Sequence, residues 1–185
     1  MFYLITILAS ALLIIFGNLA FLPFSWELLG SLSLSVIIGV VAIIAEDGLS
    51  ALIIRRLTPM RWFHPDKRFF TVSKRERNFY NAIKIKSWKD LVPELGLFTG
   101  FSKSQVEITG GSDYLERFLI ESNYGVIIHA ANALLGFVIM FLPWCSAPSV
   151  WIPIFIVNFV LSLMPVAILR HTSYTLLRLY KRSKK

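Results

Sequence analysis

Basic residues are confined to two segments of this chain. Of its 19 Lys and Arg residues, 13 lie between Arg55 and Arg117 and 6 lie between Arg170 and Lys185. None occurs in residues 1–54 or 118–169, which are strongly apolar. The whole chain is 56% hydrophobic and 16% charged, whereas a soluble domain carries about 25% charged residues. The sequence therefore indicates an integral membrane protein and argues against a soluble enzyme, a disordered chain or a nucleic-acid-binding domain.

Four segments are long and apolar enough to cross a bilayer, which takes about 20 residues. The first has no positively charged n-region, so we expect it to be retained as a span and not cleaved as a signal peptide. The sequence predicts an all-α membrane protein with four transmembrane helices and a cytoplasmic helical insertion between spans two and three. We expect the spans at Phe2 to about Leu22, Leu28 to about Leu57, Tyr124 to Leu142, and Val150 to Leu169.

The placement of charge also predicts an orientation. The turns at 23–26 and 146–149 are short and carry no Lys or Arg. The positive-inside rule then places the long central segment and the tail in the cytoplasm and the N-terminus outside. This gives a multi-pass protein of the cell membrane in four parts. They are a hairpin of spans at 1–57, an interfacial segment at 58–113, a second hairpin at 114–169 and a basic tail at 170–185.

The central segment contains readable helix signals. Ser73 and Glu76 have the spacing of a capping box, so we expect a helix over about 74–83. No helix breaker occurs between Asp113 and Pro143, so we expect a helix that runs unbroken from the cytoplasm into span three. The tail is expected to continue span four. Its basic residues favour either an anchor to anionic lipid, at about 1 kcal/mol per residue, or a clamp on a phosphate headgroup.

Polar residues in span three form one stripe. Residues 121, 125, 129 and 132 share a helix face that reads Glu121, Gly125, His129, Asn132. Glu121 and His129 are about 12 Å apart along the axis, so a ligand or another helix must bridge them. Gly125 predicts a notch between the two groups in which a ligand can sit. The alternative is that His129 hydrogen-bonds a neighbouring helix.

Other polar groups lie in spans two and four. Glu46 and Asp47 are about 27 Å along the helix from Leu28, near the inner boundary of the hydrocarbon. They form either an interfacial cluster or a carboxylate pair that faces the same pocket as His129. Asn158 is expected to make an interhelical hydrogen bond or to contact substrate.

Several kinds of site are not expected. The single cysteine, Cys145, allows no intrachain disulfide and is expected to be a buried or interfacial thiol. One Cys and three scattered His residues do not make a zinc site, so we expect no metal. The chain has no nucleophile elbow and no phosphate-binding loop of the Walker type.

Two stretches of the chain show a family resemblance. They are similar to motifs of the glycosyl-4,4'-diaponeurosporenoate acyltransferases, the small membrane acyltransferases of bacterial staphyloxanthin biosynthesis, and the similarity covers about residues 72–182. The first stretch is Glu76-Arg-Asn-Phe-Tyr80 with Ile85-Lys-Ser-Trp88-Lys89-Asp90, and the second is Tyr114-Leu-Glu-Arg-Phe118-Leu-Ile-Glu121-Ser122 with His129 in the span that follows.

The chain also departs from that family. Where the family commonly has an Arg-Gly-Glu-like run, this chain has Tyr124-Gly125-Val126. After the last span the family has a run with several arginines, whereas this chain keeps only Arg170, followed by His171. If the missing groups bind donor or acceptor in the family, this chain uses a different substrate or none.

The resemblance implies transfer of a fatty acyl group to a hydroxyl of a lipid-linked sugar on the cytoplasmic side. On this hypothesis His129 is the general base, because an imidazole titrates near neutrality, and Glu121 orients the acceptor. No bound cofactor is expected, but an acyl donor such as acyl-CoA is a co-substrate. The expected substrate-binding residues are Trp88, Lys89, Asp90, Glu76, Tyr80, Gly125, Asn132, Asn158, Arg170, His171, Glu46 and Asp47.

A second hypothesis comes from the departures. A carboxylate lost at Val126 and a reduced arginine cluster favour a non-catalytic membrane subunit or a lipid-binding partner of a larger complex. The expected partners are membrane lipids, a lipid-linked or glycosylated acceptor, and either a second copy or another membrane protein, but no nucleic acid. A small transporter is less favoured, because no inverted repeat relates residues 1–57 to 118–169.

Overall fold

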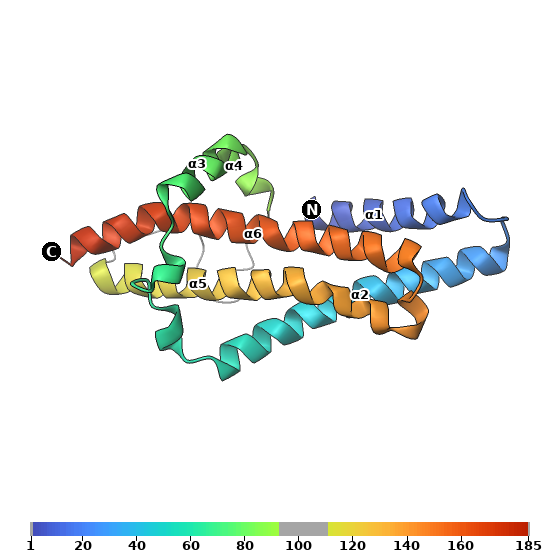
Figure 1. The fold of residues 1–185 in the computed structure, drawn as a ribbon, viewed down its shortest axis with the longest axis horizontal. Coiled ribbons are helices and arrows are strands. Elements are labelled where there is room, and N and C mark those ends of the chain that lie inside the picture. The colour runs from blue at the N-terminus through green and yellow to red at the C-terminus, as the bar shows by residue number, and fades with distance from the viewer. Residues whose placement is uncertain (1, 93–110, 185) are drawn as a thin grey trace. The chain divides into compact units, whose positions relative to one another are not determined.

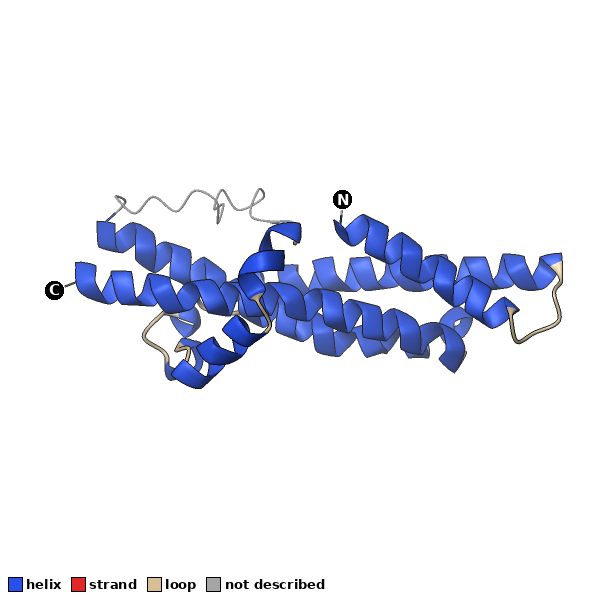
Figure 2. Cartoon of the chain, turned by 90° about the horizontal axis from the view of Figure 1, so that it is seen from above, coloured by secondary structure: helices blue, strands red, loops and turns tan. Residues whose placement is uncertain are grey.

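The computed structural model describes residues 2–92 and 111–184, and its regular elements in those ranges are all helical (Figure 2). The four long helices are labelled in Figure 1. They are α1 (Phe2–Leu19), α2 (Trp26–Leu57), α5 (Gly111–Leu135) and α6 (Pro148–Ser183). Two short helices follow α2 in the chain, α3 (Lys74–Ala82) and α4 (Ile85–Trp88). Short 3₁₀ turns cover Met60–Phe63, Arg68–Phe70, Lys89–Leu91, Gly136–Phe141 and Pro143–Cys145.

The four long helices contain the four segments predicted to span the membrane. Each is long and apolar enough to cross a bilayer, with α5 counted together with the 3₁₀ turn that follows it. The predicted fold class of four transmembrane helices is therefore confirmed. Helix α1 ends at Leu19, three residues before the expected boundary, whereas α6 continues to Ser183 and so includes most of the basic tail. Pro93 and Gly110, which the sequence marks as a helix stop and a joint, lie outside the described residues.

The described residues pack into two compact units. Unit one holds the residues up to Ile53 together with His129–Leu163. Unit two holds those between Ile54 and Ile128 together with those from Met164 onward. Helices α2, α5 and α6 therefore each contribute one part to unit one and another part to unit two.

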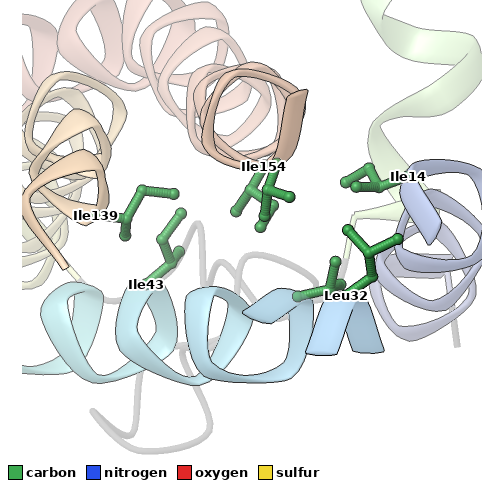
Figure 3. Close-up of a cluster of buried hydrophobic side chains, with 7 residues drawn as sticks. Ile14, Leu32, Ile43, Ile139 and Ile154 are labelled. Atoms are coloured by element: carbon green, nitrogen blue, oxygen red, sulfur yellow. The ribbon is translucent and has the colours of Figure 1, made fainter. Parts of the chain in front are cut away.

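Unit one has an aliphatic core. Figure 3 shows Ile14 of α1, Leu32 and Ile43 of α2, Ile139 of the 3₁₀ turn Gly136–Phe141 and Ile154 of α6 pointing toward one another, and all five are buried. Cys145 is also fully buried, as expected, and its thiol donates to the carbonyl of Ser35 at 3.2 Å. Large apolar side chains elsewhere on α1 and α2 are exposed, which suits helices that face lipid tails; they include Leu4, Leu8, Leu12, Leu34, Ile37 and Val41.

A hydrogen-bonded set of side chains joins three helices of unit one. Asn158 of α6 donates from Nδ2 to the carbonyl oxygen of Asn132 on α5 at 3.1 Å. Ser50 of α2 donates to the Asn132 Oδ1, and Ser162 donates to the Asn158 Oδ1 at 3.4 Å. All four side chains are buried. The predicted interhelical hydrogen bond of Asn158 is therefore confirmed, and polar pairing of this kind holds helices together in lipid.

The predicted helix that runs unbroken into span three is present as α5, but its α-helical part stops short of Pro143. The α-helical part of this segment ends at Leu135, and residues Gly136–Phe141 form a 3₁₀ turn. Near this change of helix type, the Asn132 carbonyl accepts from the side chain of Asn158 on α6. A Cβ at position 136 would lie 2.5 Å from the Asn158 Nδ2. The change of helix type thus lies where a side chain from α6 bonds to the backbone.

We expect Gly136→Ala to destabilise the protein, because the added methyl would displace the Asn158 amide from its partner. A buried amide left unpaired costs roughly 1–3 kcal/mol. The matched control is Gly30→Ala on α2, where a Cβ meets nothing within 4 Å. Thermal unfolding of the purified protein in detergent should show a lower midpoint for Gly136→Ala only. Equal midpoints for the two variants would contradict the proposed role of this contact.

Candidate functional site

Helix α3 lies beside the part of α6 that belongs to unit two (Figure 1). Its N-cap is Ser73, whose hydroxyl accepts from the Glu76 N–H at 3.1 Å, so the predicted helix start is confirmed. Glu76 and Tyr80 are four residues apart and therefore lie on one face of α3. That face meets α6 at Arg170.

Arg170 and Glu76 form a two-pronged ion pair. The guanidinium donates from Nε to Glu76 Oε1 and from Nη2 to Glu76 Oε2, the latter at 2.9 Å. Its Nη1 donates to the backbone carbonyl of Phe69 at 3.2 Å. Both side chains are largely shielded from solvent, with 16% and 24% of their surface exposed. All three guanidinium nitrogens are therefore used within the protein, and a planar fork of this kind fixes geometry as well as charge.

Tyr80 completes this group. Its hydroxyl donates to Glu76 Oε1 at 2.7 Å. Burial and the bond to the Glu76 carboxylate raise the pKa of Tyr80 to about 12, so the phenol stays protonated at neutral pH. Burial by itself would raise the pKa of Glu76. The hydrogen bonds from Arg170 and Tyr80, the positive charge of Arg170 and a bond from the Ser73 backbone outweigh burial and lower it.

Basic and aromatic side chains gather next to this pair. The rings of Tyr80 and His171 are in edge contact, with centroids 6.3 Å apart. The guanidinium carbons of Arg77 and Arg178 lie 4.6 and 5.1 Å from the centroid of the Tyr174 ring. The charges of Lys86, Lys89 and Arg77 are near enough to act on His171. We call this group the cationic cluster, and its members are Arg77, Lys86, Lys89, His171, Tyr174 and Arg178.

The predicted motif Trp88-Lys89-Asp90 makes local contacts. The indole N–H of Trp88 donates to the carbonyl of Ile83 at 3.0 Å, which closes the turn between α3 and α4. Lys89 and Asp90 are exposed and 3.8 Å apart. Of these three residues, only Lys89 belongs to the cationic cluster.

Glu121 is paired with a residue that the sequence did not suggest. In unit two its Oε2 accepts from Arg55 Nη2 at 2.9 Å. Arg55 also lies over the ring of Tyr124, at 5.4 Å from its centroid, and the Tyr124 hydroxyl donates to the carbonyl of Thr58 at 2.9 Å. The Tyr124 ring is stacked on Phe63 at 3.7 Å. Glu121 is thus part of the contacts that fasten the end of α2 and the residues after it onto α5.

The predicted notch at Gly125 is not open. A Cβ at this position would lie 2.8 Å from Cδ1 of Leu169 on α6. Glycine permits this close approach of a neighbouring side chain, and the space beside it is filled by Leu169. The expectation that Gly125 leaves room for a ligand is therefore wrong, because packing between α5 and α6 uses that room.

His129 lies in unit one with the remaining predicted site residues. Its side chain is half-buried. Asn132, one turn further along α5, accepts from Ser50, which also donates to the Asp47 carbonyl at 3.0 Å. The stretch of α2 that carries Glu46 and Asp47 therefore packs against α5 at Asn132. Carboxylate oxygens of both acidic residues are shielded from solvent.

Sequence reasoning missed part of the site. Arg77 and Tyr174 were not singled out, and Phe69 contributes only a backbone carbonyl, which no sequence pattern marks. One signal was available, because His171, Tyr174 and Arg178 are spaced at i, i+3 and i+7 and so share a face of α6. That α3 contacts this face of α6 is visible only in the tertiary structure.

We expect Glu76→Gln and Arg170→Gln each to lower the free energy of unfolding by roughly 1–3 kcal/mol, because each leaves a shielded partner unpaired. The double variant should lose less than the sum, with a coupling energy of about 1–2 kcal/mol. The control is Arg75→Gln, an exposed residue of α3. Denaturant unfolding of the wild type, the two single variants and the double variant gives the double-mutant cycle. The Arg75→Gln control is measured in the same way. Additive losses would show that the pair does not hold α3 to α6.

The lowered pKa of Glu76 determines how the stability contributed by this carboxylate changes with pH. A carboxyl whose pKa is depressed by folding contributes stability above its ordinary pKa, and the contribution is lost as pH falls through the folded value. The difference in stability between wild type and Glu76→Gln should therefore be constant near neutrality. It should shrink as the pH is lowered below 4.5, the ordinary pKa of this carboxyl, when unfolding is measured at each pH. A difference that grows on acidification would contradict the assignment.

The chain was compared with known proteins. A family model described as glycosyl-4,4'-diaponeurosporenoate acyltransferase matches residues 59–182, more than half of the 185 residues. The match covers Glu76, Tyr80, Glu121, His129 and Arg170, and it confirms the resemblance inferred from the two sequence stretches. No match was found among curated proteins or solved structures.

Proposed function

The chain belongs to the glycosyl-4,4'-diaponeurosporenoate acyltransferase family, and on that premise we propose that it acylates a hydroxyl of a glycolipid or another lipid-linked acceptor. Family membership supports an acyltransferase role, and the four apolar helices support residence in the membrane. The observation that carries the proposal is the family match itself. The matched region includes Glu76 and Arg170, and their ion pair joins a residue near its start to a residue near its end.

We propose that the reaction takes place at the cytoplasmic face. The two basic segments of the chain favour the cytoplasm by the positive-inside rule. Contacts within unit two support their lying on one side of the membrane. Glu76 pairs with Arg170, and Glu116 accepts from Tyr180 and lies 3.1 Å from Lys184. The first contact joins α3 to α6, and the second joins the start of α5 to the end of α6. These segments lie on the same side of the membrane if an even number of spans separates them.

The proposed donor is an acyl thioester such as acyl-CoA. The acceptor hydroxyl attacks the thioester carbonyl, the C–S bond breaks and the acyl group forms an ester with the acceptor oxygen. The thiolate leaves and takes up a proton. We assign the removal of the hydroxyl proton to His129, since a neutral imidazole is a competent base at physiological pH. Of the three histidines, it is the one in a segment without Lys or Arg.

Glu121 and Arg170 have different proposed roles. Each is held in an ion pair, with Arg55 and with Glu76 respectively. We therefore assign them as positioning residues that hold the segment after α2 and helix α3 against α5 and α6. Asn132 and Asn158 support the proposed base by joining α5 to α6.

A second candidate is a non-catalytic membrane subunit, and one observation favours it. At two positions where the family commonly carries charged groups, this chain has Tyr124 and Val126, whose side chains are buried within the protein. Tyr124 is stacked on Phe63 and bonded to Thr58, and Val126 is buried. On this hypothesis the protein binds a lipid or a larger partner without turning it over.

Expression of the wild type and His129→Ala in a bacterial host distinguishes the two candidates. An acyltransferase with His129 as base predicts lipid species heavier by one fatty acyl group with the wild type, and a loss of about 10²-fold or more with the variant. Untargeted mass spectrometry of total lipids measures both. The control is His64→Gln, which alters a histidine outside the spans and should leave the acylated species unchanged.

The amount of folded protein in the membrane fraction must be equal for all variants. Acylated species that persist with His129→Ala would remove the base assignment but not the activity. Purified protein that carries an acyl-CoA but never transfers the chain to any membrane lipid extract would favour the subunit hypothesis.

A further inference from the structure

Two arginines from different helices share one aromatic ring. Arg77 of α3 and Arg178 of α6 hold their guanidinium carbons 4.6 and 5.1 Å from the centre of Tyr174. Both arginines are exposed, and Tyr174 is half-buried. A ring of this kind attracts cations with its negative face. It therefore holds two positive charges near one point of the surface while leaving their hydrogen-bond donors available.

Further positive charge surrounds the same point. Lys86 and Lys89 act on His171 together with Arg77, and His171 lies one turn before Tyr174 on α6. Within residues 2–92 and 111–184, no carboxylate forms an ion pair with Arg77, Lys86 or Arg178. Glu76, which precedes Arg77 in the chain, has both oxygens occupied by Arg170 and Tyr80. Asp90, 3.8 Å from Lys89, is 85% exposed.

Apart from Lys89, the Lys and Arg residues of the cationic cluster therefore have no carboxylate partner among the described residues. Like charges held close together raise the free energy of the folded state, and a bound anion removes that cost. Arginine forks match the oxygens of phosphate, and lysines add point charge. The shielded ion pair of Arg170 lies beside the cluster and fixes α3 on α6, so these cations are placed before any ligand arrives.

We propose that the cationic cluster is a binding site for phosphate esters, and that Arg77 and Arg178 are its two principal ligands. The site deepens the proposed function and rests on it for the ligand that we expect, the nucleotide phosphates of an acyl-CoA donor. A lipid phosphate headgroup has the same chemistry and is the other source. Arg170 is excluded as a ligand, because its three guanidinium nitrogens already bond to Glu76 and Phe69.

The test is a binding measurement on the full-length protein in nanodiscs of uncharged phosphatidylcholine. CoA without an acyl chain is titrated at fixed ionic strength by calorimetry, since salt weakens such contacts. The variant is R77Q/R178Q. The matched control is R75Q/K181Q, which removes the same charge from exposed positions of the same two helices. We expect at least tenfold weaker CoA binding for R77Q/R178Q, because two charge-assisted contacts are lost. The control should change affinity less than twofold.

A second arm identifies the source of the phosphate. The same variants are titrated with phosphatidylglycerol in detergent, and the rise in unfolding temperature is measured. Loss confined to CoA assigns the site to the donor, and loss confined to phosphatidylglycerol assigns it to a lipid headgroup; either supports a phosphate-ester site. Equal losses in variant and control, or none in either arm, overturn the proposal. Neither arm requires turnover, so a failure of acyl transfer is distinguishable from a failure of this site.

Discussion

A chain in hydrocarbon must satisfy its backbone hydrogen bonds internally, and this constraint decides the architecture. It makes each span a helix and lets apolar side chains face outward, as the exposed leucines of α1 and α2 do. It also removes the usual drive for helices to associate, because lipid tails are as apolar as the side chains they would replace. Association in unit one therefore depends on close packing and on polar groups, of which Asn158 and Asn132 are the clearest pair.

The segment between α2 and α5 is held by a different kind of contact. Helices as short as α3 and α4 are not stable alone in water. Side chains of α5 and α6 hold the end of α2, the 3₁₀ turn at Phe63 and helix α3. Asn123 donates to the Phe63 carbonyl at 2.8 Å, Glu121 pairs with Arg55, and Arg170 pairs with Glu76. Polar groups of the long helices thus serve as attachment points for the short ones.

This arrangement separates two uses of arginine. Arg170, which lies in the region that matches the family model, is shielded and holds α3 in place. Arg77 and Arg178 are exposed, lie over one tyrosine and have no carboxylate partner among the described residues. The first kind of arginine builds the site, and the second kind can receive an anion. An anion bound here would therefore meet one arginine from α3 and one from α6.

The sequence alone determined the number of membrane helices, the family and the start of α3. These follow from apolar length, from short motifs and from a capping residue, which are all local. It also indicated that Glu76, Tyr80 and Arg170 matter, though not that they touch. Only the tertiary structure decided that Leu169 fills the space at Gly125, that the α-helix of span three ends at Leu135, and that Glu121 pairs with Arg55. The physical reason is that a helix face shows which residues point the same way, whereas what lies opposite that face depends on how distant segments pack.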